Sequence, residues 1–248
     1  MAADVALAPA ATWTGIYCGG GGGGDWGKFN IESHIYESGG AEHYGNGPPN
    51  SSYDDAWNPV AASVQGPFIT AICGADQQVG SNAVVGLFAD VDLQDKRGKF
   101  ENYHPWYSDP YTFQGQRWSV QLGTTATIAA RAGVLLSPDI LLFGIAGWSW
   151  ADASLAYFGG CEPSPPLANC GDIVGSARKT ISGPTFGAGI EAMLGDHWSG
   201  RIEYRATSLG KITANSASVP ASPYPGWTGI ATAAVSDQSA RLTLIYRP

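Results

Sequence analysis

The sequence predicts an all-β protein, an eight-stranded antiparallel up-and-down transmembrane β-barrel with three short turns at one end and four long loops at the other. Three observations lead to this fold class. Apolar side chains alternate with polar or charged ones along most of the chain, which is typical of strands with two different surroundings. Short and long connections between these segments alternate strictly. Charged residues make up only 14% of the chain, whereas soluble surfaces carry about a quarter to a third.

The clearest pair of strands lies between Lys179 and Gly210. Gly195-Asp196 predicts a tight hairpin turn between the two runs. The two faces of this pair differ in polarity. One face is apolar and consists of Phe186, Ala188, Ile190, Ala192, Leu194, Trp198, Ile202 and Tyr204. The opposite face carries charged residues in mid-strand, namely Glu191, Arg201, Glu203 and Arg205. A soluble sandwich would expose such charges to water, whereas a membrane barrel would turn its apolar face to lipid and its polar face inward.

The remaining strands follow the same period of two. We expect them at residues 14–27, 68–79, 84–94, 118–134 and 140–157, with a last one near the C-terminus. Six consecutive glycines, 19–24, would weaken an isolated strand but suit a narrow barrel, where large neighbouring side chains need room. The links at Gly80, Ser137 and Gly195 are about three residues long, whereas those starting near Lys28, Asp95, Gly159 and Thr213 are expected to run to about twenty or more.

Composition excludes several classes of protein. No run of about 18 apolar residues exists, so no transmembrane helix is expected. The formal charge of −8 argues against a nucleic-acid partner. We interpret Met1 as an added start on a mature sequence whose signal peptide has been removed, with residues 1–12 a flexible N-terminus and 13–248 a single barrel domain. An ordinary disordered cytoplasmic N-terminus is the alternative.

Cysteine usage suggests one disulfide and no metal. Cys161 and Cys170 bracket a proline-rich segment and are candidate partners in an oxidising compartment, while the pairing of Cys18 and Cys73 stays open. No cysteine or histidine grouping has zinc spacing, so neither a metal nor a cofactor is expected.

Tryptophans gather near the ends of the expected strands, which favours an interfacial girdle over core filling. The predicted girdle comprises Trp13, Trp198 and Tyr246 at the turn end and Trp26, Trp118, Trp148 and Trp150 near the loop end. Together with the even strand number, this girdle favours a membrane barrel over a soluble one.

The chain resembles the small eight-stranded outer-membrane β-barrel proteins of Gram-negative bacteria, in particular the alphaproteobacterial 25/31-kilodalton outer-membrane protein group, the porin-family or opacity-type barrels. The residues that carry the likeness are 13–17, 86–92, 183–191, 198–205 and 239–247. The resemblance implies location in the cell outer membrane, with lipid and lipopolysaccharide as neighbours. Two positions depart from the family pattern: the chain ends in Arg247-Pro248 instead of phenylalanine, and Phe88 stands where members often have an acid.

Charged residues on the face opposite the apolar one predict an interior network. Its members are Asp90, Asp92, Glu191 and Glu203 with Arg131, Arg201, Arg205 and Arg241. An eight-stranded barrel is just wide enough to be filled by side chains. We therefore expect a plugged interior, with a narrow porin that passes small solutes as the alternative.

Two further functions are alternatives to this structural role. One is a lipid-modifying enzyme at the membrane rim, which would need a serine beside a histidine base. The sequence shows no such arrangement at any of its histidines, His34, His43, His104 and His197, and it contains no GxSxG motif. No enzyme is therefore expected. Surface recognition is the other: the loops are rich in Tyr, Trp, Asn and Ser, which make adaptable contacts. Three ligands are hypotheses for these loops: a host or extracellular ligand, a divalent cation at the acidic first loop, and haem at the His-Tyr pairs. The sequence does not predict an oligomeric state.

Overall fold

The computed structural model describes residues 13–36, 60–103, 115–160, 173–218 and 228–248. These residues form one antiparallel sheet, and the described part of the chain contains no helix that could cross a membrane. Its strands are β1 (Gly15–Tyr36), β2 (Val60–Val79), β3 (Ala83–Leu93), β4 (Lys96–Tyr103), β5 (Gly115–Ser137), β6 (Ile140–Gly160), β7 (Ile173–Met193), β8 (Trp198–Ser218) and β9 (Thr228–Tyr246).

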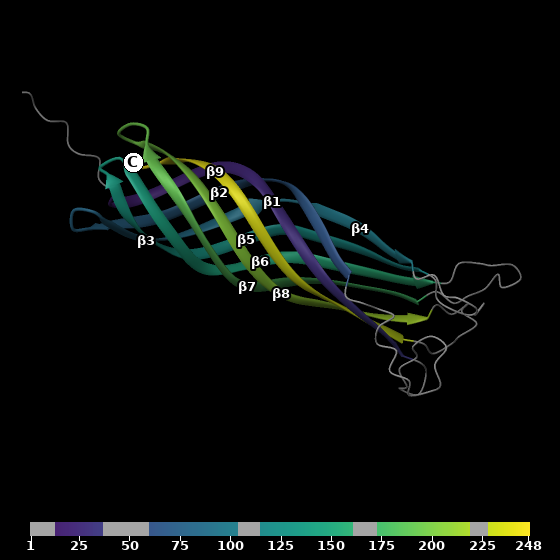
Figure 1. The fold of residues 1–248 in the computed structure, drawn as a ribbon. Helices are drawn as coiled ribbons and strands as arrows, with labels where there is room; N and C mark the ends of the chain where they lie inside the picture. The colour runs from purple at the N-terminus through teal and green to yellow at the C-terminus, as the bar shows by residue number, and fades with distance from the viewer. Residues whose placement is uncertain (1–12, 37–59, 104–114, 161–172, 219–227) are drawn as a thin grey trace, which may run out of the picture.

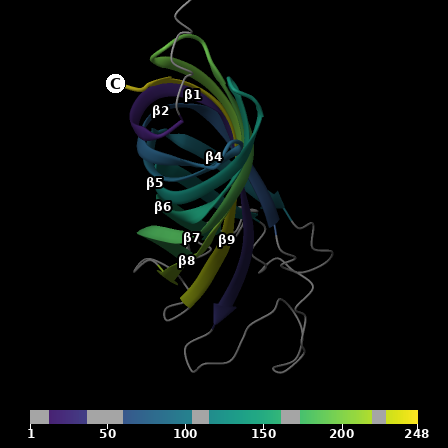
Figure 2. The same cartoon turned by 90° about the vertical axis from the view of Figure 1, so that its left-hand side faces the viewer.

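The sheet closes into a barrel of eight positions (Figures 1 and 2). β1 pairs with both β2 and β9, and the remaining neighbours follow in chain order. β3 and β4 both pair with β5, one after the other, so together they occupy a single position in the ring. The predicted fold class, an antiparallel up-and-down barrel, is confirmed. In the lower barrel every strand is paired on both sides, as a barrel in lipid requires. Among the described residues of the upper part, β2 and β4 are not paired with each other, and β7 and β8 are unpaired between Gly175 and Thr185.

The connections are segregated as predicted. Residues 80–82, 138–139 and 194–197 form the short links, and the chain's C-terminus lies at the same end (Figure 1). Segments 37–59, 104–114, 161–172 and 219–227 join strand ends at the opposite end. The strands are longer than predicted, however. β1 continues to Tyr36, β2 begins at Val60, and β4 lies in a segment that was expected to be a loop.

Two irregularities change which side chains face inward. On β5 the register shifts between Leu122 and Thr125. Even-numbered residues up to Leu122 face inward, whereas from Thr125 onward the odd-numbered residues do. On β8 a shift between Ser208 and Gly210, with Gly210 at φ 84°, has the same effect. A single inserted residue reverses the faces of a strand because the side-chain period is two.

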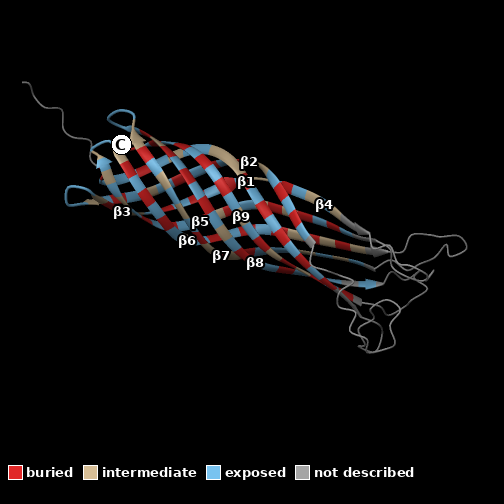
Figure 3. Ribbon diagram, in the orientation of Figure 1, coloured by how far each residue is buried: buried red, intermediate tan, exposed pale blue. Residues whose placement is uncertain are grey.

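Buried and exposed residues alternate along the strands (Figure 3), and the residue types at these positions divide the barrel into two regions. We call the part between the short turns and Trp26, Trp148 and Trp150 the lower barrel, and the part beyond these residues the upper barrel. The lower barrel exposes large apolar side chains, with Leu87, Ile128, Phe186, Ile202 and Leu242 all between 58% and 64% exposed. The upper barrel buries its large apolar side chains inside: Phe29, Ile31, Ala62, Val64, Trp118, Val120, Leu122, Ala151, Ala153, Leu155, Tyr157, Ile181, Leu209, Ile212, Ala214, Ala231, Ala233 and Val235. A smaller apolar cluster, which includes Leu141, Phe143 and Ile145, lies inside the lower barrel.

The glycine run on β1 makes room for large side chains in the lower barrel. A Cβ on Gly23 would lie 2.7 Å from the Phe68 ring. Beside this run, Cys18 on β1 and Cys73 on β2 are register partners and form a disulfide on the outer face.

Candidate functional site in the barrel interior

Glu191 on β7 is the centre of a charged cluster near the short turns. Its carboxylate accepts hydrogen bonds from Arg131 (2.6 Å), Arg201 (2.9 Å) and Arg247 (2.8 Å), and from Ser199 Oγ (2.7 Å). The Glu191 side chain is fully buried, as is that of Arg131. Burying an ion costs several kcal/mol unless it is paired, so these contacts account for the cluster's place inside the barrel.

Asp76 on β2 is the second acid of this cluster. It accepts a bond of 2.7 Å from Arg131 Nε and one of 3.0 Å from Arg247 Nη2, and its other contact to Arg131 makes the pairing bidentate. Aromatic rings fill the space between the guanidinium groups. The Tyr17 ring lies 4.7 Å from Arg247 and 5.1 Å from Arg131, distances at which a cation is attracted to the ring face.

Trp13 closes the turn end of the interior. Its indole Nε1 donates to the Pro138 carbonyl oxygen (2.9 Å), and its ring lies 5.2 Å from the Arg247 guanidinium. The side chain is fully buried. Trp13 precedes β1 and folds across the end of the barrel, so it contacts the cluster instead of the surrounding solvent or lipid.

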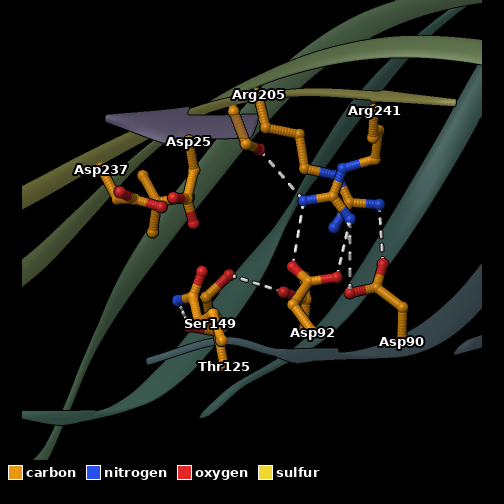
Figure 4. Close-up of polar contacts among 12 residues, drawn as sticks. Asp25, Asp90, Asp92, Thr125, Ser149, Arg205, Asp237 and Arg241 are labelled. Atoms are coloured by element: carbon orange, nitrogen blue, oxygen red, sulfur yellow. Dashed lines mark hydrogen bonds and ion pairs between the residues drawn. The ribbon is translucent and has the colours of Figure 1, made fainter. Parts of the chain in front are cut away.

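A second cluster lies above the first and joins β3, β8 and β9 (Figure 4). Arg241 binds both oxygens of Asp92, at 3.2 and 3.1 Å, and Arg205 Nη2 lies 2.6 Å from Asp90 Oδ2. Arg205 also donates to Glu203. The rings of Phe88 and Phe68 lie beside Arg205 and Arg241, at 5.2 and 5.0 Å.

A belt of hydroxyl groups and one lysine separate the charged clusters from the upper barrel. Thr127 and Ser149 share a hydrogen bond of 2.9 Å, and Thr125 accepts one of 2.8 Å from Gln94. Above them Lys96, fully buried, lies 2.7 Å from both Asp25 and Asp237. The apolar core of the upper barrel follows directly, since Phe29 and Val235 continue the inward faces that carry Asp25 and Asp237.

All eight charged residues that the sequence analysis assigned to an interior network lie inside the barrel and are buried. Five further charged residues lie inside the barrel and are not part of the predicted network, namely Asp25, Asp76, Lys96, Asp237 and Arg247. Asp76 follows the inward phase of Ile72 and Gly74 and could have been found from it. Lys96 lies in a segment whose composition predicts a loop. With all of them counted, acids and bases in the interior are nearly equal in number, as a low-dielectric site requires.

Of the seven residues predicted to form an aromatic girdle, five lie on the outer face and two are buried inside. Trp26, Trp148, Trp150, Trp198 and Tyr246 are between 39% and 49% exposed on the outer face. Trp118 is buried in the apolar core because the irregularity on β5 turns it inward. Trp13 is buried at the turn end, as described above. At about 2.5 Å of axial rise per residue in a tilted strand, the upper tryptophans lie about 20–27 Å from the short turns, near the height of an apolar band.

Several predicted features lie outside the described residues, namely the Cys161–Cys170 pair, His43, His104 and the acidic residues of the first loop beyond Glu32. Of the other histidines, His197 lies in a short turn, where its Nδ1 is 2.9 Å from the carbonyl oxygen of Arg247. Groups of three or more metal-ligating side chains are absent from the described ranges.

Comparison with known proteins assigns the family. The model of the outer membrane protein beta-barrel domain matches residues 1–222. The chain belongs to this family. It is therefore a protein of the cell outer membrane, with its short turns in the periplasm and its long connections outside the cell. The narrower 25/31-kilodalton group is not established by this match. No curated protein matches the sequence.

Solved structures of similar fold come from several bacteria. OprG of Pseudomonas aeruginosa is 10% identical, with a TM-score of 0.48 and coverage of 95% of this chain and 97% of that one. The protease OmpT of Escherichia coli is 11% identical, with a TM-score of 0.46 and coverage of 94% and 96%. Ail of Yersinia pestis, in complex with a heparin analogue, is 11% identical, with a TM-score of 0.39 and coverage of 92% and 99%. At these values the likeness says nothing about activity.

Proposed function

We propose that this outer-membrane barrel is closed to solutes and non-catalytic, that it contributes to the integrity of the envelope, and that it presents its external connections for recognition or adhesion. The observation that carries the proposal is the filling of the interior over its whole length. Two clusters of paired charges occupy the lower barrel, and the apolar core occupies the upper barrel.

The apolar core is the stronger of the two barriers. A hydrated ion that entered from outside would have to displace packed side chains such as Phe29, Leu122 and Leu155, each fully or almost fully buried. Isolated charges are costly in such surroundings. Below this core, the arginines that could attract an anion are already bound to carboxylates. The interior charges therefore act as structural pairs in this proposal and not as a selectivity filter.

A swelling assay on proteoliposomes tests the closed interior. We expect vesicles that contain the folded protein to swell in small sugars no faster than protein-free vesicles, whereas a general porin in parallel vesicles gives rapid swelling. Swelling that rises with protein content would favour the narrow-porin alternative.

Two other parts of the proposal have separate tests. Protease added to intact cells should cleave at the long connections and leave the barrel as a protected fragment; full protection would contradict surface presentation. The non-catalytic role is supported by the position of His197 at a periplasmic turn, where its ring nitrogen faces a backbone carbonyl. Release of fatty acid from lipid A by the purified protein would overturn it.

A further inference from the structure

The acids and bases buried inside the barrel do not balance at one site. Among the described residues, seven acids lie in the interior, namely Asp25, Asp76, Asp90, Asp92, Glu191, Glu203 and Asp237. Six bases face them, namely Lys96, Arg131, Arg201, Arg205, Arg241 and Arg247. The two arginine clusters together contain five acids and five arginines. The surplus acid therefore belongs to the group of Lys96, Asp25 and Asp237, which we call the junction site.

The junction site has one ammonium group between two carboxyl groups. Lys96 Nζ lies 2.7 Å from Asp25 Oδ2 and 2.7 Å from Asp237 Oδ1. The side chain of Lys96 is fully buried, and those of Asp25 and Asp237 are 2% and 14% exposed. Figure 4 shows the two carboxyl groups next to each other. If both were ionised, the site would hold one uncompensated negative charge in the barrel interior.

One carboxyl oxygen of the junction site has no partner. Asp25 Oδ1 is buried and has no hydrogen-bond partner among the described residues. An ionised carboxylate can only accept hydrogen bonds, and it is costly to bury without donors. A partnerless oxygen costs much less on a carboxyl group that carries a proton and no charge. The free oxygen therefore favours a neutral Asp25.

Apolar side chains border the junction site. A Cβ on Gly27 would lie 3.4 Å from Asp237 Oδ1 and 3.1 Å from Val64 Cγ2, so the carboxyl group and the valine share the space beside this glycine. The stem of Lys96 passes over Gly66, where a Cβ would lie 3.1 Å from Lys96 Cγ. A surplus charge next to the apolar core of the upper barrel costs several kcal/mol unless it is paired.

Neighbouring charged groups do not supply the missing positive charge. Arg241 on β9 binds both oxygens of Asp92 on β3, at 3.2 and 3.1 Å. Arg205 on β8 is bound to Asp90 and Glu203. The buried polar residues that β2, β5, β6 and β7 contribute around this level do not titrate, namely Thr70, Thr125, Ser149 and Thr185.

A proton fits the missing charge better than a metal ion does. Hard cations such as Ca²⁺ take about six to eight oxygen ligands. Groups of three or more metal-ligating side chains do not occur in the described part of the chain. Lys96 also occupies the position between the two carboxyl groups. A proton needs only one carboxyl oxygen.

From this geometry we propose that the junction site binds one proton, held by the pair Asp25 and Asp237, and that this proton makes the stability of the barrel depend on pH. With the proton bound, one carboxyl group is neutral and the site carries no net charge. The two carboxyl groups are close enough to titrate as a unit. Loss of the proton in alkaline medium leaves a surplus charge between the lower and the upper barrel.

The sign of the pH dependence follows from proton counting. The unfolded chain releases its aspartate protons near pH 4, at about the ordinary value for this side chain. The folded protein keeps one of them to higher pH, so stability falls as pH rises from about 4 until the pair is fully ionised. One extra proton in the folded state changes the ratio of folded to unfolded protein by up to about tenfold per pH unit.

Urea unfolding of the full-length protein in detergent, from mildly acidic to alkaline pH, tests the proposal. We expect Asp25→Asn and Asp237→Asn each to raise the ratio of folded to unfolded protein by about tenfold or more at alkaline pH, and to weaken its pH dependence. The double variant should lower this ratio by about tenfold or more, because Lys96 is then buried without a carboxylate. Asp95→Asn, at an exposed acid, is the matched control and should keep the pH dependence of the unaltered protein.

Infrared spectroscopy detects the proton without unfolding the protein. A protonated carboxyl group gives a carbonyl band that ionised carboxylates lack. The difference spectrum between the unaltered protein and each single variant should contain this band at neutral pH and lose it at alkaline pH. This measurement also decides the matter if the double variant does not fold, which heat-modifiable migration reports.

Several outcomes would overturn the proposal. These are single variants that lose stability as a broken ion pair would, a pH dependence that both single variants retain in full, or a difference spectrum without the carbonyl band. Replacement of sodium by choline at constant ionic strength should leave stability unchanged, and a loss would assign the missing charge to an alkali ion instead. The inference does not rest on the proposed function, because a conducting or catalytic barrel would leave each of these results unchanged.

Discussion

In the lower barrel the outer face is apolar and charged clusters share the interior with apolar side chains, whereas in the upper barrel the outer face is polar and the interior is mainly apolar. Both regions use the same eight strand positions and the same alternation of side chains. The difference follows from what surrounds each region. Lipid accepts Leu87 and Phe186 on the outside, so the lower barrel does not depend on an interior made of apolar groups alone. Its buried apolar side chains, such as Phe143, pack beside the charged clusters. Water around the upper barrel restores the hydrophobic effect as the reason for an apolar core.

The comparison also explains how the interior is held together. In the lower barrel, directional ion pairs such as Glu191 with Arg131 determine which strands face each other. In the upper barrel, packing among Leu122, Leu155 and their neighbours performs this role. Loss of an ion pair in the lower barrel and loss of a packed side chain in the upper barrel should therefore lower the free energy of unfolding by different amounts.

The largest effect is expected at Glu191. Glu191→Gln keeps the shape of the side chain and removes the charge that Arg131, Arg201 and Arg247 share, which leaves buried cations uncompensated. We expect the free energy of unfolding to fall by about 3–5 kcal/mol. Urea unfolding of the refolded protein in detergent measures it. Glu32→Gln, on the exposed face of the upper barrel, is the matched control, and an equal loss in both variants would contradict the role of the cluster.

A somewhat smaller effect is expected in the upper barrel. Leu155→Ala removes a fully buried side chain from the apolar core and should lower the free energy of unfolding by about 2–5 kcal/mol. Leu244→Ala, on the outer face of the lower barrel, should cost less because that side chain is 47% exposed and leaves no cavity. If the second variant loses as much as the first, the upper interior is not a packed core.

The third-largest effect on stability is expected at the Cys18–Cys73 disulfide. It closes a sequence separation of 55 residues next to a glycine run that carries no side chains to define strand register. The double variant Cys18→Ser, Cys73→Ser should lose about 2–4 kcal/mol of stability. Thermal unfolding in the presence and absence of reductant measures this. If neither the double substitution nor the reductant lowers stability, the side chains on β2 and β9 are sufficient to define the register of β1.

The smallest effect is expected in the hydroxyl belt. Thr127→Val removes the hydrogen bond to Ser149 and leaves one buried hydroxyl without its partner. The expected loss is about 1 kcal/mol. The double variant Thr127→Val, Ser149→Ala should recover part of it, since both polar groups are then gone. A loss as large as that at Glu191 would mean that the belt belongs to the charged network.

The sequence predicts the lower barrel well because lipid and a charged interior impose opposite demands on adjacent residues. Val85, Leu87 and Val91 face outward, and Asp90 and Asp92 face inward, as the period of two requires. The short turns at Gly80 and Gly195 follow from residues suited to tight turns, and Gly80 adopts φ 66°.

The upper barrel was largely missed because its polarity is reversed. Segments such as β4, with Lys96, Arg97 and Lys99, have the composition of a loop although they form strands. The irregularity near Thr125 then reverses the faces of β5, which no pattern of hydrophobicity reveals in advance. Trp118 was assigned to the girdle for this reason. The partners of Arg247 could not be predicted either, since they depend on how the barrel closes around Asp76 and Glu191.

Single-channel recording in planar bilayers tests the central claim, a closed interior, most directly. The unaltered protein, shown to be folded by heat-modifiable migration, is added to both sides of the bilayer in molar salt. The account predicts a baseline current that is indistinguishable from the protein-free bilayer. Stable openings of one reproducible conductance would contradict it.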